Sequence, residues 1–395
     1  KKVSAAVKMA ERAEAYLSRK KNAASGLEAE TWQHFQDYYS RKLWHELALA
    51  VNAFTNSPPE SVDLKEFYDN FISDFEHRIN PLQLVEIVLP ISSFIFNNAR
   101  PAAFDFLDRI ERTVSKDKLA TTRVHVGKIK LMLENKDAQE RVVDIEEVRK
   151  LIESTRTEVD AVGGVCEVHA PFYKVSSVYL KEMGDYAGYY REALRYLGVE
   201  DHTKISPEEK HVHAVLLGFA ALLGENIFNF GELLAHPILL ALEGSAEKWI
   251  VDVLFAFNSG DLDKFRSLER FWAEWDDLKR RSDILYGKIR LLSLMELALS
   301  RTSKNREISF SEIAAKAEIK DSEVEHLVMR ALARKLIRGS IDEVKKRVTI
   351  DWVQPRVLDG SQLLLVAGRV HQWTRDVFGM ENLVTENAKE ILTRA

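Results

Sequence analysis

The fold of the C-terminal part is decided by residues 308–352, ISFSEIAAKAEIKDSEVEHLVMRALARKLIRGSIDEVKKRVTIDW. Ser309 and Glu312 form the sequence pattern of a capping box, which begins a short helix, and a second short helix follows after a tight turn. Segments 337–342 and 347–352 then alternate apolar and polar residues, as strands of a hairpin do. Helix, helix and hairpin in this order predict a winged helix.

On the N-terminal side of this module, short amphipathic segments follow one another. Their apolar residues recur at three- and four-residue spacing, and breakers such as Pro58 and Pro81 separate the segments. Residues 179–198 show one helical hairpin clearly, with Gly184 at the turn. Such a pair buries its apolar face only by stacking on its neighbours. We therefore predict a right-handed helical-repeat solenoid of tetratricopeptide type, with an irregular period.

The segments between the solenoid and the winged helix also read as helices. Asn258 to Asp261 predict a helix stop and restart. Residues 285–299 are apolar on most faces, so this helix should be buried where two modules join.

The predicted fold is mainly α: a solenoid, a winged-helix module and a long C-terminal helix. The predicted parts are a basic, mobile helical extension (1–30), a helical-repeat arm (31–242), a module (243–360) with a helical part (243–300) and a winged helix (301–360), and a C-terminal bundle helix (361–395).

The C-terminal helix carries a narrow apolar seam. Its apolar positions follow alternating three- and four-residue steps, which is the spacing of a coiled-coil seam: Leu363, Val366, Val370, Trp373 and Val377. The same spacing also occurs where a helix packs inside its own protein. The pattern alone leaves both interpretations open.

Composition and charge exclude several classes of protein. The chain has 395 residues, a net charge of −5, and no apolar run of the ~20 residues that a membrane-spanning helix needs. A negative balance disfavours a protein whose main task is to neutralise phosphates. The single cysteine, Cys166, excludes an intrachain disulfide framework and suits the reducing cytosol or nucleus.

Few residues suggest catalysis or metal binding. His211 and His213 have the two-residue spacing of zinc isopeptidases, but positions i and i+2 of a helix do not converge on one ion. Cys166 and His169 lie close in sequence, yet a catalytic thiol also needs oxyanion donors in a defined pocket. The sequence contains no phosphate-binding glycine motif. We expect no catalytic residue, metal, cofactor or small-molecule substrate.

A winged helix can also bind DNA through its second helix. Here that helix begins with acidic residues, Asp321, Glu323 and Glu325, which would face the phosphates. Arg330, Arg334 and Lys335 only balance them. We therefore expect no DNA binding.

Several stretches carry a resemblance to a known family: residues 228–234, 256–260, 339–344 and 352–359, with 42–45, 68–73 and 76–78 upstream. In these stretches the sequence resembles the PCI-domain subunits of the proteasome lid. The resemblance covers nearly everything after residue 30, except the loop 163–168.

The resemblance implies a structural role in ubiquitin-dependent protein degradation, in the cytoplasm and nucleus. It implies a winged helix that stacks edge to edge with neighbouring PCI-domain subunits and a terminal helix that enters a shared bundle. The implied partners are other lid subunits, including the deubiquitinase and its partner and the ubiquitin receptor. The resemblance also implies that catalysis belongs to other subunits.

Two groups of residues are the expected protein interface. We expect the strand with Val348, Ile350 and Trp352 at the margin of its sheet, where unpaired backbone groups allow a neighbour to add. We expect Trp373 to anchor the seam of the terminal helix. The alternatives are a PCI subunit of a sister complex, such as the signalosome or a translation-initiation assembly, and a winged-helix nucleic-acid binder.

Overall fold

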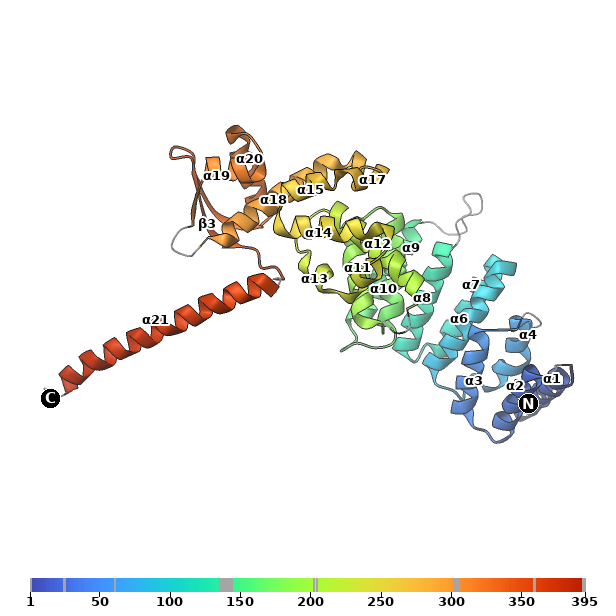
Figure 1. Cartoon of the computed structure of the whole chain (residues 1–395). Coiled ribbons are helices and arrows are strands. Elements are labelled where there is room, and N and C mark those ends of the chain that lie inside the picture. Colours follow the sequence, from blue (N-terminus) through green and yellow to red (C-terminus); the bar gives the residue numbers. More distant parts are fainter. Residues whose placement is uncertain are drawn as a thin grey trace. The chain divides into compact units, whose positions relative to one another are not determined.

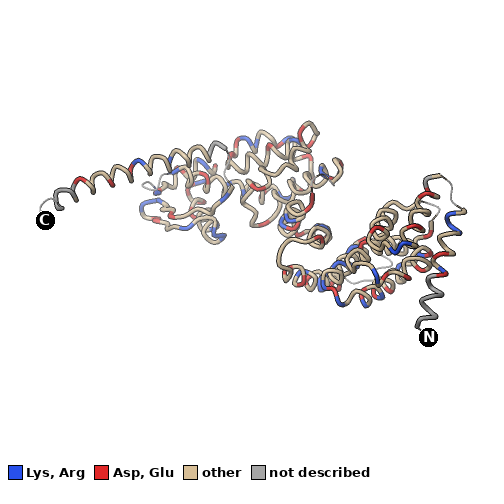
Figure 2. The backbone as a smooth tube through the Cα atoms, turned by 90° about the horizontal axis from the view of Figure 1, so that it is seen from below, with Lys and Arg blue, Asp and Glu red and all other residues tan. Residues whose placement is uncertain are grey.

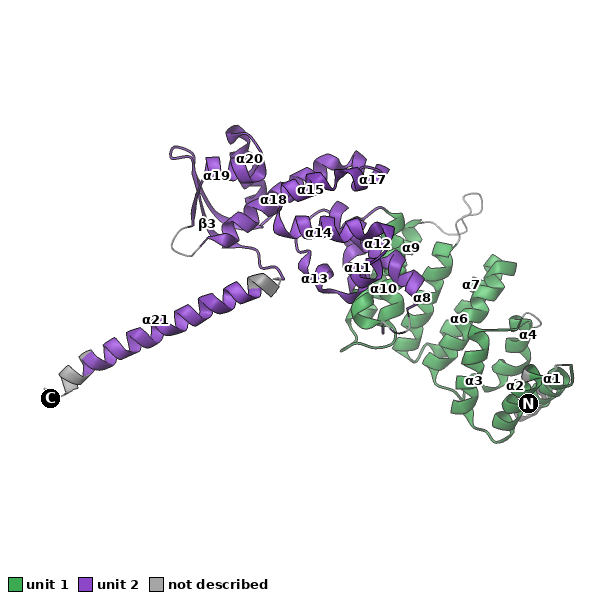
Figure 3. Ribbon diagram, viewed as in Figure 1, with its two compact units in different colours: residues 1–183, 195–200 green, residues 184–194, 201–395 purple. Residues whose placement is uncertain are grey.

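The computed structural model describes residues 2–392 apart from 24–25, 60–61, 135–144, 202, 204, 302–305 and 358–359. The chain forms two compact units, shown in two colours in Figure 3. Unit 1 comprises residues 1–183 and 195–200, and unit 2 comprises residues 184–194 and 201–395. Each unit is described below by itself.

Unit 1 is a row of helices that follow one another in chain order (Figure 1). They are α1 (Lys2–Ala23), α2 (Leu27–Ser40), α3 (Trp44–Asn56), α4 (Leu64–Phe67), the π-helix η1 (Tyr68–Ile72), α5 (Ser73–Phe75), α6 (Pro81–Asn98), α7 (Arg100–Val114), α8 (Lys118–Glu134), α9 (Ile145–Asp160) and α10 (His169–Glu182). Helices adjacent in sequence pack on each other, as α1 does on α2 and α6 on α7. The predicted mainly α, helical-repeat fold is confirmed. The next helix, α11 (Tyr186–Val199), continues the chain into unit 2.

Aromatic rings form the first part of the core of unit 1. The Trp32 ring centroid lies 5.7 Å from that of Phe35 and 5.4 Å from that of Phe54, both at steep angles. Phe67 and Phe71 extend this group and are fully buried. Edge-to-face contacts of this kind add to the stabilisation from burial alone.

From residue 11 onward, the basic N-terminal segment packs on the core of unit 1, unlike the mobile extension that the sequence suggested. In α1, Tyr16 and Leu17 are buried, and the Tyr16 ring centroid lies 6.2 Å from that of Trp32. The helix thus covers the aromatic core with one apolar face and turns charged residues outward. The side chains of residues 1–10 fall outside the part that the structure describes.

Unit 2 begins with helices and ends with a small sheet and a long helix. Its further elements are α12 (Pro207–Leu223), α13 (Gly231–Ala235), the 3-10 helices η2 (Pro237–Leu242) and η3 (Ala246–Lys248), α14 (Trp249–Ser259), α15 (Leu262–Ser267), α16 (Glu269–Trp272), α17 (Asp276–Arg280), α18 (Ser282–Ser300), β1 (Glu307–Ser309), α19 (Phe310–Ala317), α20 (Asp321–Ala333), β2 (Ile337–Asp342), β3 (Arg347–Val353) and α21 (Gly360–Leu392).

The turn between α14 and α15 follows the sequence prediction. Gly260 ends α14 with a φ of 62°, and the Asp261 carboxylate accepts the N–H of Lys264 at 3.2 Å to begin α15. A Cβ on Gly260 would lie 2.6 Å from Cα of Ser293 in α18. Only glycine meets both requirements, the left-handed backbone and the close approach of α18.

The helix predicted to be buried at a joint is α18, and it contains a buried lysine. Lys288 is 4 % exposed, and its Nζ donates to the carbonyl oxygens of Ala221, Leu222 and Gly224 at 2.6, 3.2 and 2.9 Å. These carbonyls end α12, where a helix has acceptors without partners of its own. The lysine therefore ties α18 to the end of α12.

The winged helix has the predicted local structure. The Ser309 hydroxyl accepts the N–H of Glu312, and the Glu312 carboxylate accepts the N–H of Ser309, both at 3.3 Å. Helices α19 and α20 follow, and residues 343–346 form the turn between β2 and β3. The capping box and the hairpin are both confirmed.

The expected edge position of β3 is wrong. The strand order is β1-β3-β2, so β3 lies in the middle of the sheet. Residues 307–309 pair along one side of β3, and residues 337–342 pair along the other side. The short strand β1, which directly precedes α19, pairs with β3 and occupies the edge that was expected to be free.

Lys288 provides a pH-dependent test of this packing. Burial lowers the pKa of Lys288 to about 7, with a further contribution from the Arg334 charge. Between this pKa and the ordinary value of 10.5, Lys288 is neutral in the folded protein but protonated in the unfolded chain. The free energy of unfolding should therefore rise with pH by up to about 1.4 kcal/mol per pH unit. In Lys288→Met this contribution is absent. Denaturant unfolding at pH 6.5, 7.5 and 8.5 should show the stability of the variant falling relative to the unchanged protein as the pH rises.

The exposed Lys279 supplies the control, because Lys279→Met removes a lysine charge from the surface of the same unit. Its stability should follow that of the unchanged protein at every pH. If the stability of Lys288→Met also changed with pH in the same way as that of the unchanged protein, the pKa assigned to Lys288 would be contradicted.

Candidate protein-interaction surface

The C-terminal helix α21 presents the predicted seam to solvent. The seam side chains are exposed by 56 % (Leu363), 39 % (Val366), 54 % (Val370), 69 % (Trp373) and 50 % (Val377). Met380 and Val384 continue the same spacing and are exposed as well. With 33 residues and a rise of about 1.5 Å per residue, α21 is about 50 Å long.

The exposed seam is one continuous apolar strip, because residues at alternating three- and four-residue steps share a face of a helix. A strip of this extent is typical of an interaction site. Further exposed apolar residues lie on other faces of α21: Leu364, Leu365, Phe378 and Leu383. The apolar surface is therefore wider than contact with one partner helix requires.

The predicted interface residues of β3 have different surroundings. Val348 and Ile350 are only 1 % and 3 % exposed, and β3 packs against α18. Trp352 is half-buried, and the Arg338 guanidinium of β2 lies 4.7 Å from its ring centroid. Two of the three side chains thus belong to the core of the module, and the structure does not bring them to a surface.

The edges of the sheet are β1 and β2. Strand β2 pairs with β3 on one side only, so its other side carries backbone groups that a neighbouring chain could meet. The pairing is irregular between Arg338 and Gly339. Such a bulge bends a strand and limits the length over which a partner can pair with it.

The DNA-binding alternative gains no support from α20. Its first turn exposes Asp321 and Glu323, which a phosphate backbone would repel. Figure 2 shows basic and acidic residues interspersed along the chain, in place of a basic stripe. The charges of α20 therefore give no support to DNA binding through this helix.

Cys166 and His169 are in contact at the start of α10. The Cys166 Sγ lies 3.1 Å from His169 Nδ1, and the same nitrogen accepts the backbone N–H of Cys166 at 3.1 Å. The imidazole thus satisfies a backbone donor at the entry to a helix. This gives the pair a structural role that needs no catalytic explanation.

His211 pairs with a carboxylate of η3. His211 Nε2 lies 3.3 Å from Glu247 in η3. Within the described ranges, no group of three or more His, Cys, Asp or Glu residues could hold a metal ion.

None of the described helices is both long enough and apolar enough to cross a membrane.

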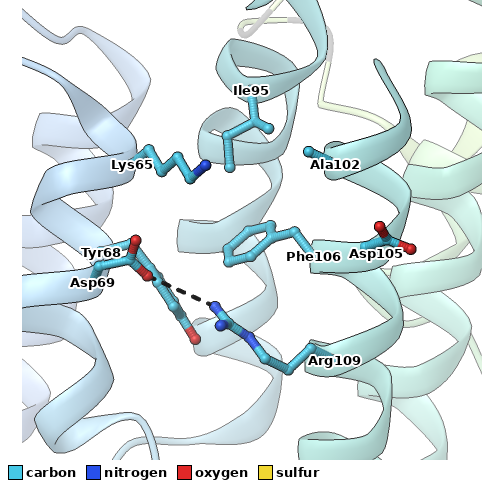
Figure 4. Close-up of a pocket in the computed structure, with 8 residues that line it drawn as sticks. All are labelled: Lys65, Tyr68, Asp69, Ile95, Ala102, Asp105, Phe106 and Arg109. Atoms are coloured by element: carbon cyan, nitrogen blue, oxygen red, sulfur yellow. Dashed lines mark ion pairs between the residues drawn. The ribbon is translucent and has the colours of Figure 1, made fainter. Parts of the chain in front are cut away.

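Unit 1 has a hollow of about 230 Å³ between η1 and α7. Figure 4 shows the Phe106 ring pointing into it, with Lys65 above and Arg109 below. The Arg109 guanidinium lies 5.2 Å from the Phe106 ring centroid and 4.0 Å from Asp69. Asp69 and Asp105 balance the two cations of the lining, so the hollow selects no particular ligand charge.

Two family profiles match the chain. The profile of the PSD13 N-terminal repeats matches residues 31–254, and that of the PCI domain matches residues 265–352. Together they cover the helical arm and the winged helix, whereas α1 and α21 lie outside both matches.

The chain is similar over nearly its whole length to proteasome regulatory subunits. It is 35% identical to the 26S proteasome non-ATPase regulatory subunit 13 of Dictyostelium discoideum, over 91% of this chain and 93% of that protein. It is also 35% identical to the probable 26S proteasome regulatory subunit rpn9 of Schizosaccharomyces pombe, over 90% of this chain and 91% of that protein.

A more distant similarity reaches a translation-initiation protein. Subunit M of eukaryotic translation initiation factor 3 from Chaetomium globosum is 28% identical, over 49% of this chain and 45% of that protein. The match extends over only half of each chain, so it is much weaker support for the initiation-factor alternative.

A pair of matched substitutions separates core from surface among the predicted interface residues. Val348→Ala should lower the free energy of unfolding by about 2 kcal/mol, because it removes buried methyl groups and leaves a cavity. Val370→Ala should change it by less than about 0.5 kcal/mol, because this valine is exposed. Denaturant unfolding of the purified chain, followed by circular dichroism, measures both. Equal effects would show that one of the two environments is assigned wrongly.

Proposed function

The chain belongs to the family of 26S proteasome non-ATPase regulatory subunit 13, and from this premise we propose that it acts as a structural subunit of the proteasome lid. It is a PCI-domain subunit of the regulatory particle, with a role in ubiquitin-dependent protein degradation. The observation that carries the proposal is the 35% identity to a regulatory subunit 13 over 91% of the chain.

The subunit acts through its shape and its protein-interaction surfaces. The exposed seam of α21 offers apolar side chains to partner helices, and full burial of one large apolar side chain contributes about 1.5–3 kcal/mol. Several such side chains on one helix can support a stable contact even after the entropy lost on association is subtracted. The outer sides of β1 and β2 are the sheet edges where a neighbouring PCI module could lie.

The proposed partners are the other lid subunits: the PCI-domain neighbours, the deubiquitinase with its partner, and the ubiquitin receptor. We further propose that the chain has no catalytic activity of its own and that it resides in the cytoplasm and nucleus, where proteasomes act. Its relatives are named as regulatory subunits, which supports this view. The local role found for the Cys166–His169 contact supports it as well.

Mass spectrometry of native complexes that contain a tagged copy of the chain tests the class of the protein. The proposal expects proteasome ATPases and lid subunits in the same complex. Recovery of initiation-factor or signalosome subunits in their place would assign the chain to a sister complex and contradict the proposal.

Trp373→Ala tests the seam of α21. Trp373 is the most exposed of the five predicted seam residues, and large aromatic anchors carry a disproportionate share of interface energy. We expect the variant to fold normally, since it removes no buried contact, and to enter the lid about tenfold less well, for an interface loss of about 1.4 kcal/mol. Native gels and quantitative mass spectrometry of assembled complexes measure this.

Phe255→Ala is the matched control, because Phe255 is also a large exposed aromatic residue but lies in α14, outside α21. It should enter the lid like the unchanged chain. Full incorporation of Trp373→Ala would rule out Trp373 as an anchor.

A further inference from the structure

Three stretches that carried the family resemblance meet at one place in unit 2. They contain Asn229, Asn258 and Arg356, which are about 30 to 130 positions apart in the chain. In sequence they are separate motifs, and the proposed function does not use them. In the structure they surround the segment that joins β3 to α21.

Arg356 is the centre of this arrangement. Its side chain is only 2 % exposed, it forms an ion pair with Glu296 of α18, and its Nη1 donates to the carbonyl oxygen of Asn258 at 3.0 Å. Asn258 lies in the last turn of α14, whose carbonyls have no partners within their own helix. One guanidinium thus joins the connecting segment to two helices, through a bidentate group that lysine cannot reproduce.

The residues on either side of Arg356 are also held. The N–H of Val357 donates to Oδ1 of Asn229 at 3.2 Å, and the N–H of Gln354 donates to the carbonyl oxygen of Leu336 at 2.8 Å. Val357 approaches Gly231 so closely that a Cβ there would lie 2.5 Å from the Val357 Cβ. Any larger residue at position 231 would push the segment away.

We name these residues the root clamp: Asn229, Gly231, Asn258, Glu296, Leu336, Gln354, Arg356 and Val357. Only two residues separate Val357 from the first residue of α21. We propose that the root clamp fixes the base of α21 to the module and that Arg356 is a positioning residue for the docking of this helix. The inference rests on the proposed function, in which α21 docks on partner helices.

The physical reason is preorganisation. A helix that leaves the module through a free segment samples many directions, and its docking loses that freedom. A fixed base removes part of this loss before the partner binds, so the same seam binds more tightly. With a fixed base, the docking of α21 also fixes the position of the module, whereas a free linker would leave the module able to move.

Hydrogen exchange in the isolated full-length chain tests the clamp without any partner. In Arg356→Ala and Asn229→Ala, the backbone amides of Gln354 and Val357 should exchange at least about tenfold faster than in the unchanged chain, because the segment that carries their hydrogen bonds opens more often. Arg266→Ala is the control, since it removes an exposed arginine that pairs with Glu318 elsewhere in the unit. It should leave these amides unchanged. Unchanged exchange in both clamp variants would overturn the proposal.

Incorporation into the lid tests the consequence. Arg356→Ala and Asn229→Ala should enter about threefold to tenfold less well, Arg356→Lys should be intermediate, and Arg266→Ala should be normal. If Arg356→Ala unfolds the module, the milder Asn229→Ala decides the outcome. Fast exchange with full incorporation would show that the clamp does not position α21.

A chain that ends at residue 359 separates this inference from the function on which it rests. If the truncated chain is not incorporated into the lid, α21 docks as proposed. Normal incorporation of the clamp variants would then contradict the root clamp and leave the proposed function intact. Normal incorporation of the truncated chain contradicts the docking of α21, and with it both proposals.

Discussion

A helix with an apolar stripe is stable in water only when another surface covers that stripe, and this constraint organises the whole chain. In unit 1 each helix covers its neighbour, and α1 covers the aromatic group around Trp32. In unit 2 the apolar helix α18 is enclosed, and Lys288 satisfies the carbonyls at the end of α12. The apolar stripe of α21 remains exposed. By the same constraint, we expect other chains to cover it.

The sequence was sufficient for features that depend on neighbouring residues. The capping box at Ser309, the left-handed stop at Gly260 and the turn at residues 343–346 are local patterns whose physical causes lie within a few positions. The seam of α21 could also be located, because helical periodicity fixes which residues share a face. Periodicity could not say whether the seam is covered, and the resemblance to lid subunits was needed for that expectation.

The sequence was insufficient where distant segments decide the outcome. The alternation in β3 predicted a strand but not its place, which depends on β1 lying along its other side. The N-terminal helix looked mobile because it is rich in charge, whereas Tyr16 and Leu17 find their partners in helices that follow. The root clamp joins Val357 to a residue 128 positions away, and no local pattern contains such information.

The central claim is that the seam of α21 lies against other polypeptides. Photo-crosslinking in the assembled complex tests it most directly, with the reactive amino acid placed in turn at Val370, Trp373 and Val377, and at Arg375 on the opposite face as reference. The account predicts that the three seam positions cross-link to other subunits with clearly higher yield than Arg375. Cross-links confined to the chain itself, or equal yields on both faces, would contradict it.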